Sequence, residues 1–204
     1  GVVITATTTS TYISLKVPTN VVGSWRTFDN VSAKELQGYY TDRNYLEFDG
    51  ADDFLQTNNI DFTSTDKVSV FAGVRKLSDV ATGVVCEFGA NVDVTNGTFS
   101  IMAPALAGTA KFRIGVRGSV LRSVETTAIE YSAPMSAVVM SNVSLQKPLV
   151  ELRVNSKSLQ KSTADLGGGN LSSNSLYLGR RVSGNLPFNG NIYSLIGISR
   201  LTTD

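Results

Sequence analysis

The chain has 204 residues, of which 42% are hydrophobic and 17% charged, with a formal net charge of +1 and no histidine. This composition supplies enough apolar side chains for a core and excludes an intrinsically disordered chain. Basic residues are scattered along a nearly neutral chain, which argues against nucleic acid as a partner. No apolar run approaches the roughly 18 residues of a membrane helix, so membrane insertion is not expected.

The absence of histidine removes whole classes of chemistry. Ser-His and Cys-His nucleophilic catalysis and histidine-ligated metal sites are excluded. The single cysteine, Cys86, excludes an intrachain disulfide. Alternation along 83–89 places Val84, Cys86 and Phe88 on one face of a strand, which predicts a buried thiol that packs as a small hydrophobic group.

The N-terminal part of the chain is the least regular. Residues 1–20 are rich in threonine and extended as far as Pro18, which predicts an arm or linker strand, or a first hairpin. Because the chain begins at Gly1 without Met, we expect a processed product or a domain excised from a longer protein. We assign residues 21–204 to one β-sandwich domain, with a possible helical turn in 32–40.

From Tyr45 onward the pattern is that of strands separated by Gly, Asn, Asp and Ser. Alternation in 67–74 places Val68, Val70, Ala72 and Val74 on one face, and three consecutive apolar residues at 137–139 predict a strand buried on both faces. In all, about a dozen short strands are expected. This count predicts an all-β jelly-roll sandwich of two antiparallel sheets. Further strands are predicted at 98–102, 111–116 and 149–154.

Three segments carry a family resemblance. They are Phe-Asp-Gly-Ala-Asp-Asp at 48–53, Leu-Tyr-Leu-Gly-Arg at 176–180, and 188–198 with its Phe-Asn-Gly-Asn-Ile start. In this order they resemble the opening and closing strands of laminin-G-like domains of the concanavalin A superfamily. The resemblance covers roughly residues 45–204 and implies a concanavalin A-like jelly roll. Asn155-Ser156 departs from the Asn-Gly turn that is commoner in the family.

The closing segment 198–204 resembles the ends of such domains in virion proteins of tailed phages and prophages. Those relatives are mostly adhesive or structural parts of tails, fibres and decorations, and they are often trimeric. The resemblance therefore implies a non-enzymatic module on the virion surface, outside the cell, that binds bacterial surface carbohydrate and other virion proteins, with a homotrimer as a possible assembly. The alternative is an architectural capsid or tail decoration domain that makes subunit contacts.

Among the motifs of the sequence, Glu47-x-Asp49-x-x-Asp52 is the most specific candidate for a catalytic site. It resembles the Glu-x-Asp-x-x-Glu strand of concanavalin-type glucanases of the laminarinase group, in which two carboxyl groups about 5–5.5 Å apart perform retaining hydrolysis. Here the third acid is a shorter Asp beyond Gly50. We therefore favour a structural turn, and a glycan hydrolase that uses Glu47 and Asp52 is the third functional hypothesis.

Asp49, Asp52 and Asp53 also suggest calcium, because clustered carboxylates suit a hard cation. The alternative, which we favour, is that these side chains shape the turn through Asx-type hydrogen bonds. No other cofactor is expected.

Two groups of residues are candidates for ligand binding. Trp25, Tyr39 and Tyr40, and also Tyr45, offer aromatic faces that could stack on sugar rings, although the same region could form a subunit interface. Arg180 and Arg181 could form bidentate hydrogen bonds with the carboxylates of acidic sugars. The alternative is that both arginines belong to a solvent-exposed turn with no ligand. Most other aromatic residues are expected in the core, among them Phe48, Phe71, Phe88 and Phe112.

Overall fold

A computed structural model describes residues 44–127 and 131–202. The predicted N-terminal arm at 1–20 and the candidates Trp25, Tyr39 and Tyr40 lie outside these residues. The described part is built of β-strands, with no α-helix. None of its residues forms a helix that is long and apolar enough to cross a membrane.

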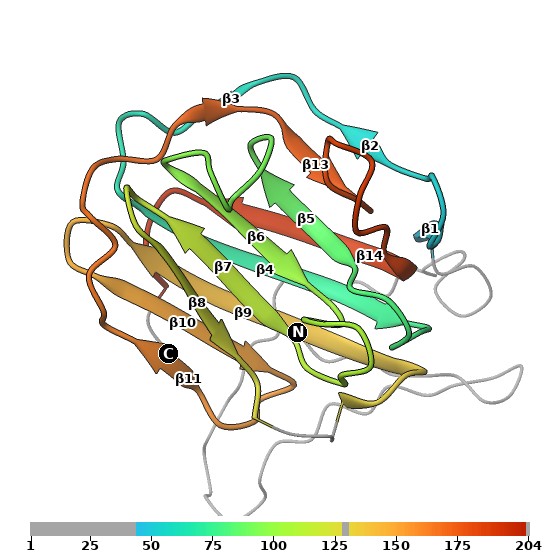
Figure 1. The fold of residues 1–204 in the computed structure, drawn as a ribbon. Helices are drawn as coiled ribbons and strands as arrows, with labels where there is room; N and C mark the ends of the chain where they lie inside the picture. Colours follow the sequence, from blue (N-terminus) through green and yellow to red (C-terminus); the bar gives the residue numbers. More distant parts are fainter. Residues whose placement is uncertain (1–43, 128–130, 203–204) are drawn as a thin grey trace, which may run out of the picture. The chain divides into compact units, whose positions relative to one another are not determined.

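Two six-stranded antiparallel sheets form the domain (Figure 1). The first, which we call the β4 sheet, has the order β1 (Leu46–Asp49), β14 (Asn189–Ile198), β4 (Lys67–Lys76), β9 (Met135–Ser144), β10 (Leu149–Val154), β11 (Gln160–Ser162). The second, the β5 sheet, has the order β2 (Leu55–Gln56), β13 (Leu176–Leu178), β5 (Val84–Phe88), β6 (Thr98–Met102), β7 (Arg113–Arg117), β8 (Leu121–Glu125). A two-stranded sheet pairs β3 (Ile60–Asp61) with β12 (Ser173–Asn174).

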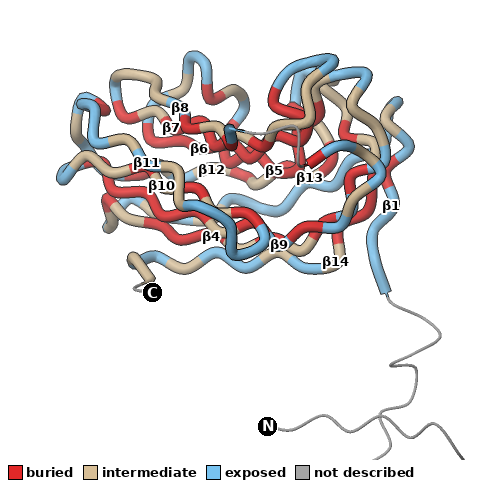
Figure 2. The backbone as a smooth tube through the Cα atoms, turned by 90° about the horizontal axis from the view of Figure 1, so that it is seen from below, coloured by how far each residue is buried: buried red, intermediate tan, exposed pale blue. Residues whose placement is uncertain are grey.

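The two large sheets are stacked as layers, and buried residues run along the strands of both layers (Figure 2). The apolar ones form a single core cluster to which both sheets contribute. This architecture confirms the predicted all-β jelly roll. Burial of the apolar faces between the layers supplies the main driving force, and each fully buried Phe contributes about 1.5–3 kcal/mol. Phe48, Phe88 and Phe112 are at most 2% exposed, as predicted.

Strand β4 lies in the middle of its sheet and follows the predicted alternation. Val68, Val70, Ala72 and Val74 are each at most 2% exposed and face the β5 sheet. Its register with β9 runs from Lys67 opposite Ser144 to Lys76 opposite Met135.

Two predictions about the β4 sheet were wrong. Val138 is 62% exposed, because β9 is buried on one face only over 136–139, with Ala137 and Val139 turned inward. Phe71 lies between the inward residues Val70 and Ala72, so its side chain projects from the outer face of the sheet.

The turn after β10 keeps a hairpin conformation without glycine. Asn155 and Ser156 have φ values of 50° and 57°, the signs required by a type I′ turn, and the Lys157 amide donates to the Val154 carbonyl at 3.0 Å. The Asn155 side chain accepts a hydrogen bond from the Val138 amide at 2.7 Å and donates to the Ser136 carbonyl at 3.2 Å. Asparagine tolerates this conformation better than most residues, and these bonds hold it there.

Candidate functional site

The acidic turn after β1 holds the predicted carboxylates. Glu47 and Asp49 lie on β1, whereas Asp52 lies beyond its end, after Gly50. The Asp49 carboxylate accepts a hydrogen bond from the Ala51 amide at 2.7 Å, and the Asp53 carboxylate accepts one from the Asp49 amide at 3.2 Å. These bonds give the turn the Asx-type geometry expected of a structural element.

Asp49, Asp52 and Asp53 each offer a carboxylate oxygen, and these oxygens lie within 4.8 Å of one another on exposed side chains. An all-oxygen donor set of this kind fits calcium chemically. Two of the three carboxylates already accept backbone hydrogen bonds, so the turn is held together by the chain itself.

The two arginines that follow β13 point to different partners. The Arg180 guanidinium lies over the exposed Phe54 ring, 4.2 Å from its centroid. Arg181 is only 7% exposed, and it donates from Nε to Glu87 at 3.0 Å and from Nη1 to Asp93 at 2.7 Å. The structure therefore does not bring the two guanidinium groups together as one site for an acidic sugar.

Electrostatics supports a structural role for Arg181. Burial raises the pKa of the Glu87 carboxyl, and hydrogen bonds from Arg181 and the Val92 amide offset part of that effect. Burial by itself lowers the pKa of Arg181, but the carboxylates of Glu87 and Asp93 outweigh burial and raise it. The guanidinium is therefore a permanent charge that compensates a fully buried carboxyl.

A lysine ends the inward alternation of β4. Lys76 occupies the next inward position after Val74, and its side chain is 0% exposed. Its ammonium forms an ion pair with Asp79, donates to the Ala110 carbonyl at 3.2 Å, and lies 5.3 Å from the centre of the Phe112 ring. Burial lowers the pKa of Lys76, and Asp79 opposes this effect. A buried charge of this kind requires such compensation.

Asp79 connects Lys76 to three loops. Its second carboxylate oxygen accepts a hydrogen bond from the Ala133 amide at 2.7 Å, and its carbonyl accepts one from the Gly108 amide at 2.8 Å. Lys76 and Asp79 together therefore connect the loop after β4, the loop after β6 and the segment before β9.

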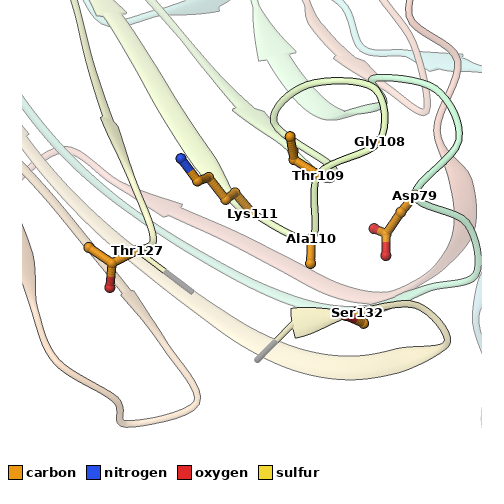
Figure 3. A pocket seen from close by; sticks show the side chains of 7 residues that line it. All are labelled: Asp79, Gly108, Thr109, Ala110, Lys111, Thr127 and Ser132. Carbon is orange, nitrogen blue, oxygen red and sulfur yellow. The ribbon is translucent and has the colours of Figure 1, made fainter. Parts of the chain in front are cut away.

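A polar pocket of about 330 Å³ lies at this junction (Figure 3). In that view Asp79 and Ser132 lie on one side of Ala110, and Lys111 and Thr127 lie on the other. The Lys111 ammonium lies 3.4 Å from the Glu125 carboxylate, and its side chain is 41% exposed. The described residues that line the pocket are Asp79, Gly108, Thr109, Ala110, Lys111, Thr127 and Ser132.

Sequence reasoning missed this pocket. A usable signal was present, because Lys76 continues the alternation of Val68 to Val74 and an acidic residue follows three positions later. A charged residue at an inward position predicts a buried ion pair. The contributions of Ala110, Lys111 and Ser132 depend on contacts between distant segments and have no local signature.

A second recess, of about 310 Å³, lies beside β1 and β14, where Tyr45 contacts Tyr193. The two rings are 5.7 Å apart at an interplanar angle of 68°, and Tyr45 is 47% exposed. Tyr45 is thus the one predicted stacking residue within the described part of the chain, and it lies in a mainly apolar groove.

No family model matches the sequence, and no curated protein matches it. Solved structures do match. A heptameric SAP-like pentraxin from Limulus polyphemus aligns at 13% identity with a TM-score of 0.58, over 77% of this chain and 76% of the pentraxin. Domains LG4-5 of the mouse laminin alpha1 chain align at 13% identity with a TM-score of 0.58, over 83% of this chain and 47% of the laminin chain.

The carbohydrate-binding module CBM40 of the Ruminococcus gnavus IT-sialidase, bound to alpha2,3 sialyllactose, aligns at 13% identity with a TM-score of 0.53. The alignment covers 74% of this chain and 94% of the module. At these identities the similarity concerns the fold. Together with the sheet order, it shows that the described domain has a concanavalin A-like jelly-roll fold, the fold that these structures share.

Proposed function

We propose that this domain is a non-enzymatic carbohydrate-binding module, and that the polar pocket at Asp79 receives the sugar. The observation that carries the proposal is the cluster of donors and acceptors that the buried Lys76 fixes in one place. Structural neighbours that include a carbohydrate-binding module and laminin G domains fit glycan binding in general.

The pocket matches the chemistry of a single sugar ring. Its volume of about 330 Å³ lies at the lower end of the range for small-ligand sites. Asp79 offers acceptors to sugar hydroxyl groups, Lys111 offers a charged donor, and the hydroxyls of Thr127 and Ser132 serve as either. Because Asp79 is held by Lys76 and Ala133, little ordering entropy opposes binding.

A glycan array with the purified chain tests the proposal, and Lys111→Met supplies the critical variant. We expect saturable binding by the wild type and a loss of about tenfold or more in the variant, which lacks one charge-assisted hydrogen bond. Lys161→Met is the matched control, because Lys161 is also an exposed lysine close to a carboxylate, 3.5 Å from Glu151. Equal losses in both variants, or a blank array, would contradict a sugar site at Asp79.

We further propose that the module acts on a phage virion surface, outside the cell, and adheres to bacterial surface carbohydrate. The resemblance of segment 198–204 to the ends of virion domains supports this assignment. A homotrimer and contacts with other virion proteins belong to the same proposal. Binding to host cells that is no better than that of the Lys111→Met variant would count against adhesion.

Calcium at Asp49, Asp52 and Asp53 is a separate proposal. Their oxygen donors fit the cation, and their exposure leaves them open to solvent. Repeating the array in chelator decides whether binding requires the metal. Binding that is unchanged in chelator would separate the acidic turn from sugar recognition.

One observation favours an architectural role as the second candidate. The outer face of the β4 sheet carries a cross-strand apolar row, in which Ile196 lies opposite Phe71 and Phe71 opposite Met140. Ile196 is 57% exposed, and the nearby Val138 is 62% exposed. Such a face suits contacts between subunits. Light scattering that shows concentration-dependent assembly, reduced by Ile196→Lys, would support this candidate.

A further inference from the structure

A cavity between the two sheets lies at the end of β4 remote from Asp79. Its volume is about 290 Å³. The floor consists of fully or almost fully buried side chains, namely Val68, Val70, Cys86, Phe88 and Phe99. The rim consists of residues that are partly or largely exposed, namely Ile60, Phe62, Leu176, Leu195 and Gly197. The cavity therefore opens to one side of the sandwich.

Gly197 explains why the sheets leave space here. In the register of β14 with β4, Gly197 lies opposite Val70, whose side chain faces the core, so position 197 also faces inward. A Cβ built on Gly197 meets no heavy atom of the described residues within 4 Å. Its φ lies outside the left-handed region, so the backbone does not require glycine. The strand thus omits a core side chain where its conformation would accept one.

The edge of β14 supplies the opening. Strand β1 pairs with β14 only up to Ile192, and no other strand of the described chain covers the edge of 194–198. Gly197 itself is exposed. A ligand that passes this glycine can therefore reach the buried rings of Phe88 and Phe99, beside the partly exposed Phe62. The Phe62 and Phe88 ring centroids are 5.3 Å apart, and those of Phe88 and Phe99 are 5.4 Å apart.

From this geometry we propose that the cavity binds the alkyl chain of a small amphipathic molecule, with the polar head left in solvent at the Gly197 rim. The described lining residues carry no charge. A polar group inside would lose its hydrogen bonds to water without replacement, so the occupant must be apolar. The volume corresponds to a chain of roughly ten carbons, if each occupies about the 30 Å³ that a water molecule takes in the liquid.

The chemistry of Cys86 is consistent with an apolar interior. Burial raises the pKa of its thiol to about 12, so at neutral pH the cavity wall presents an uncharged sulfur. This site is independent of the sugar pocket, since the two lie at opposite ends of β4 and share no described lining residue.

Titration calorimetry with sodium decanoate, below its micelle-forming concentration, tests the site. We expect saturable binding that strengthens about fourfold for each CH₂ added in the series hexanoate, octanoate, decanoate. Gly197→Leu places a side chain in the cavity and should reduce decanoate affinity at least tenfold. The affinity of Gly197→Ala should lie between those of the wild type and Gly197→Leu. The folded state of each variant is checked by thermal unfolding, where Gly197→Leu should unfold at the wild-type temperature or above.

Ile196→Leu is the matched control, because residue 196 is the neighbour on the opposite, exposed face. The proposal requires this variant to bind decanoate as the wild type does. Wild-type binding that is absent, independent of chain length, or undiminished in a folded Gly197→Leu protein would overturn it. So would an equal loss in Ile196→Leu, which would place the alkyl chain on the outer face of the β4 sheet.

Discussion

The polar pocket at Asp79 and the apolar cavity at Gly197 are built on the two ends of one strand. At its start, β4 contributes Val68 and Val70 to the cavity, and at its end it contributes the buried Lys76 that anchors Asp79. All three side chains obey the same inward alternation. The difference teaches that one residue at an inward position determines the chemistry of each site. Lysine at 76 assembles a polar pocket, whereas glycine at 197, opposite Val70 on the neighbouring strand β14, leaves an apolar cavity.

The largest expected effect is at the apolar end. Phe88 is 0% exposed and stacks on Phe99, so Phe88→Ala removes a ring from a close-packed wall. We expect a loss of about 4 kcal/mol in the free energy of unfolding, measured by urea denaturation. Phe54→Ala is the control, since Phe54 is 43% exposed and should cost less than about 1 kcal/mol. Similar losses in both variants would contradict the assignment of Phe88 to the main core.

The stability of the polar end of β4 should depend on the ion pair between Lys76 and Asp79. Lys76→Met removes the cation and leaves the Asp79 carboxylate without a neutralising charge, which should cost about 3 kcal/mol in the free energy of unfolding. The Lys76→Met, Asp79→Asn double variant should recover much of that loss, because neither charge remains to be compensated. A double variant that is as unstable as Lys76→Met alone would mean that packing, not charge, holds the pocket.

The smallest expected effect is the loss of stability at acidic pH that results from protonation of Asp66. Asp66 lies just before β4. Its carboxylate forms an ion pair with the Lys67 ammonium at 2.8 Å and accepts a hydrogen bond from the Ser144 hydroxyl at 3.1 Å. Burial by itself raises the pKa of Asp66, but the hydrogen bonds to its carboxylate outweigh burial and hold the pKa below the usual 3.8. The stability that Asp66 contributes is therefore present above pH 3.8 and is lost as the pH falls through the lower, folded-state pKa.

Thermal unfolding measured between neutral pH and about pH 2 checks this dependence. Asp66→Asn should be slightly less stable than the wild type at neutral pH and should lose less stability on acidification. Parallel curves for the two proteins would show that other carboxylates account for the acid response.

The sequence allowed the fold to be predicted because its signals are local. Alternation of Val68 to Val74 and the ordered turn and strand segments near Asp49, Leu176 and Asn189 specify the sandwich without knowledge of distant contacts. The same local logic failed at Val138, because three consecutive apolar residues do not reveal whether the outer face of a sheet is covered.

The candidate sites were harder to predict because they depend on contacts between distant residues. Arg181 is adjacent to Arg180 in the chain, yet its partners Glu87 and Asp93 lie 94 and 88 positions away. The polar pocket likewise joins segments around Asp79, Ala110 and Ser132. By contrast, the hydrogen bonds within the acidic turn at Asp49 connect residues at most four apart, and that turn was foreseen.

The buried thiol of Cys86 also makes the chain a convenient subject for site-specific labelling. Cys86 is the single cysteine of the sequence, it is 0% exposed, and burial raises its pKa to about 12. Maleimides react with the thiolate, which is scarce at this position at neutral pH. A cysteine introduced beside the polar pocket at Asp79 or at the cavity rim would therefore carry a fluorophore alone, with the native residue left in place.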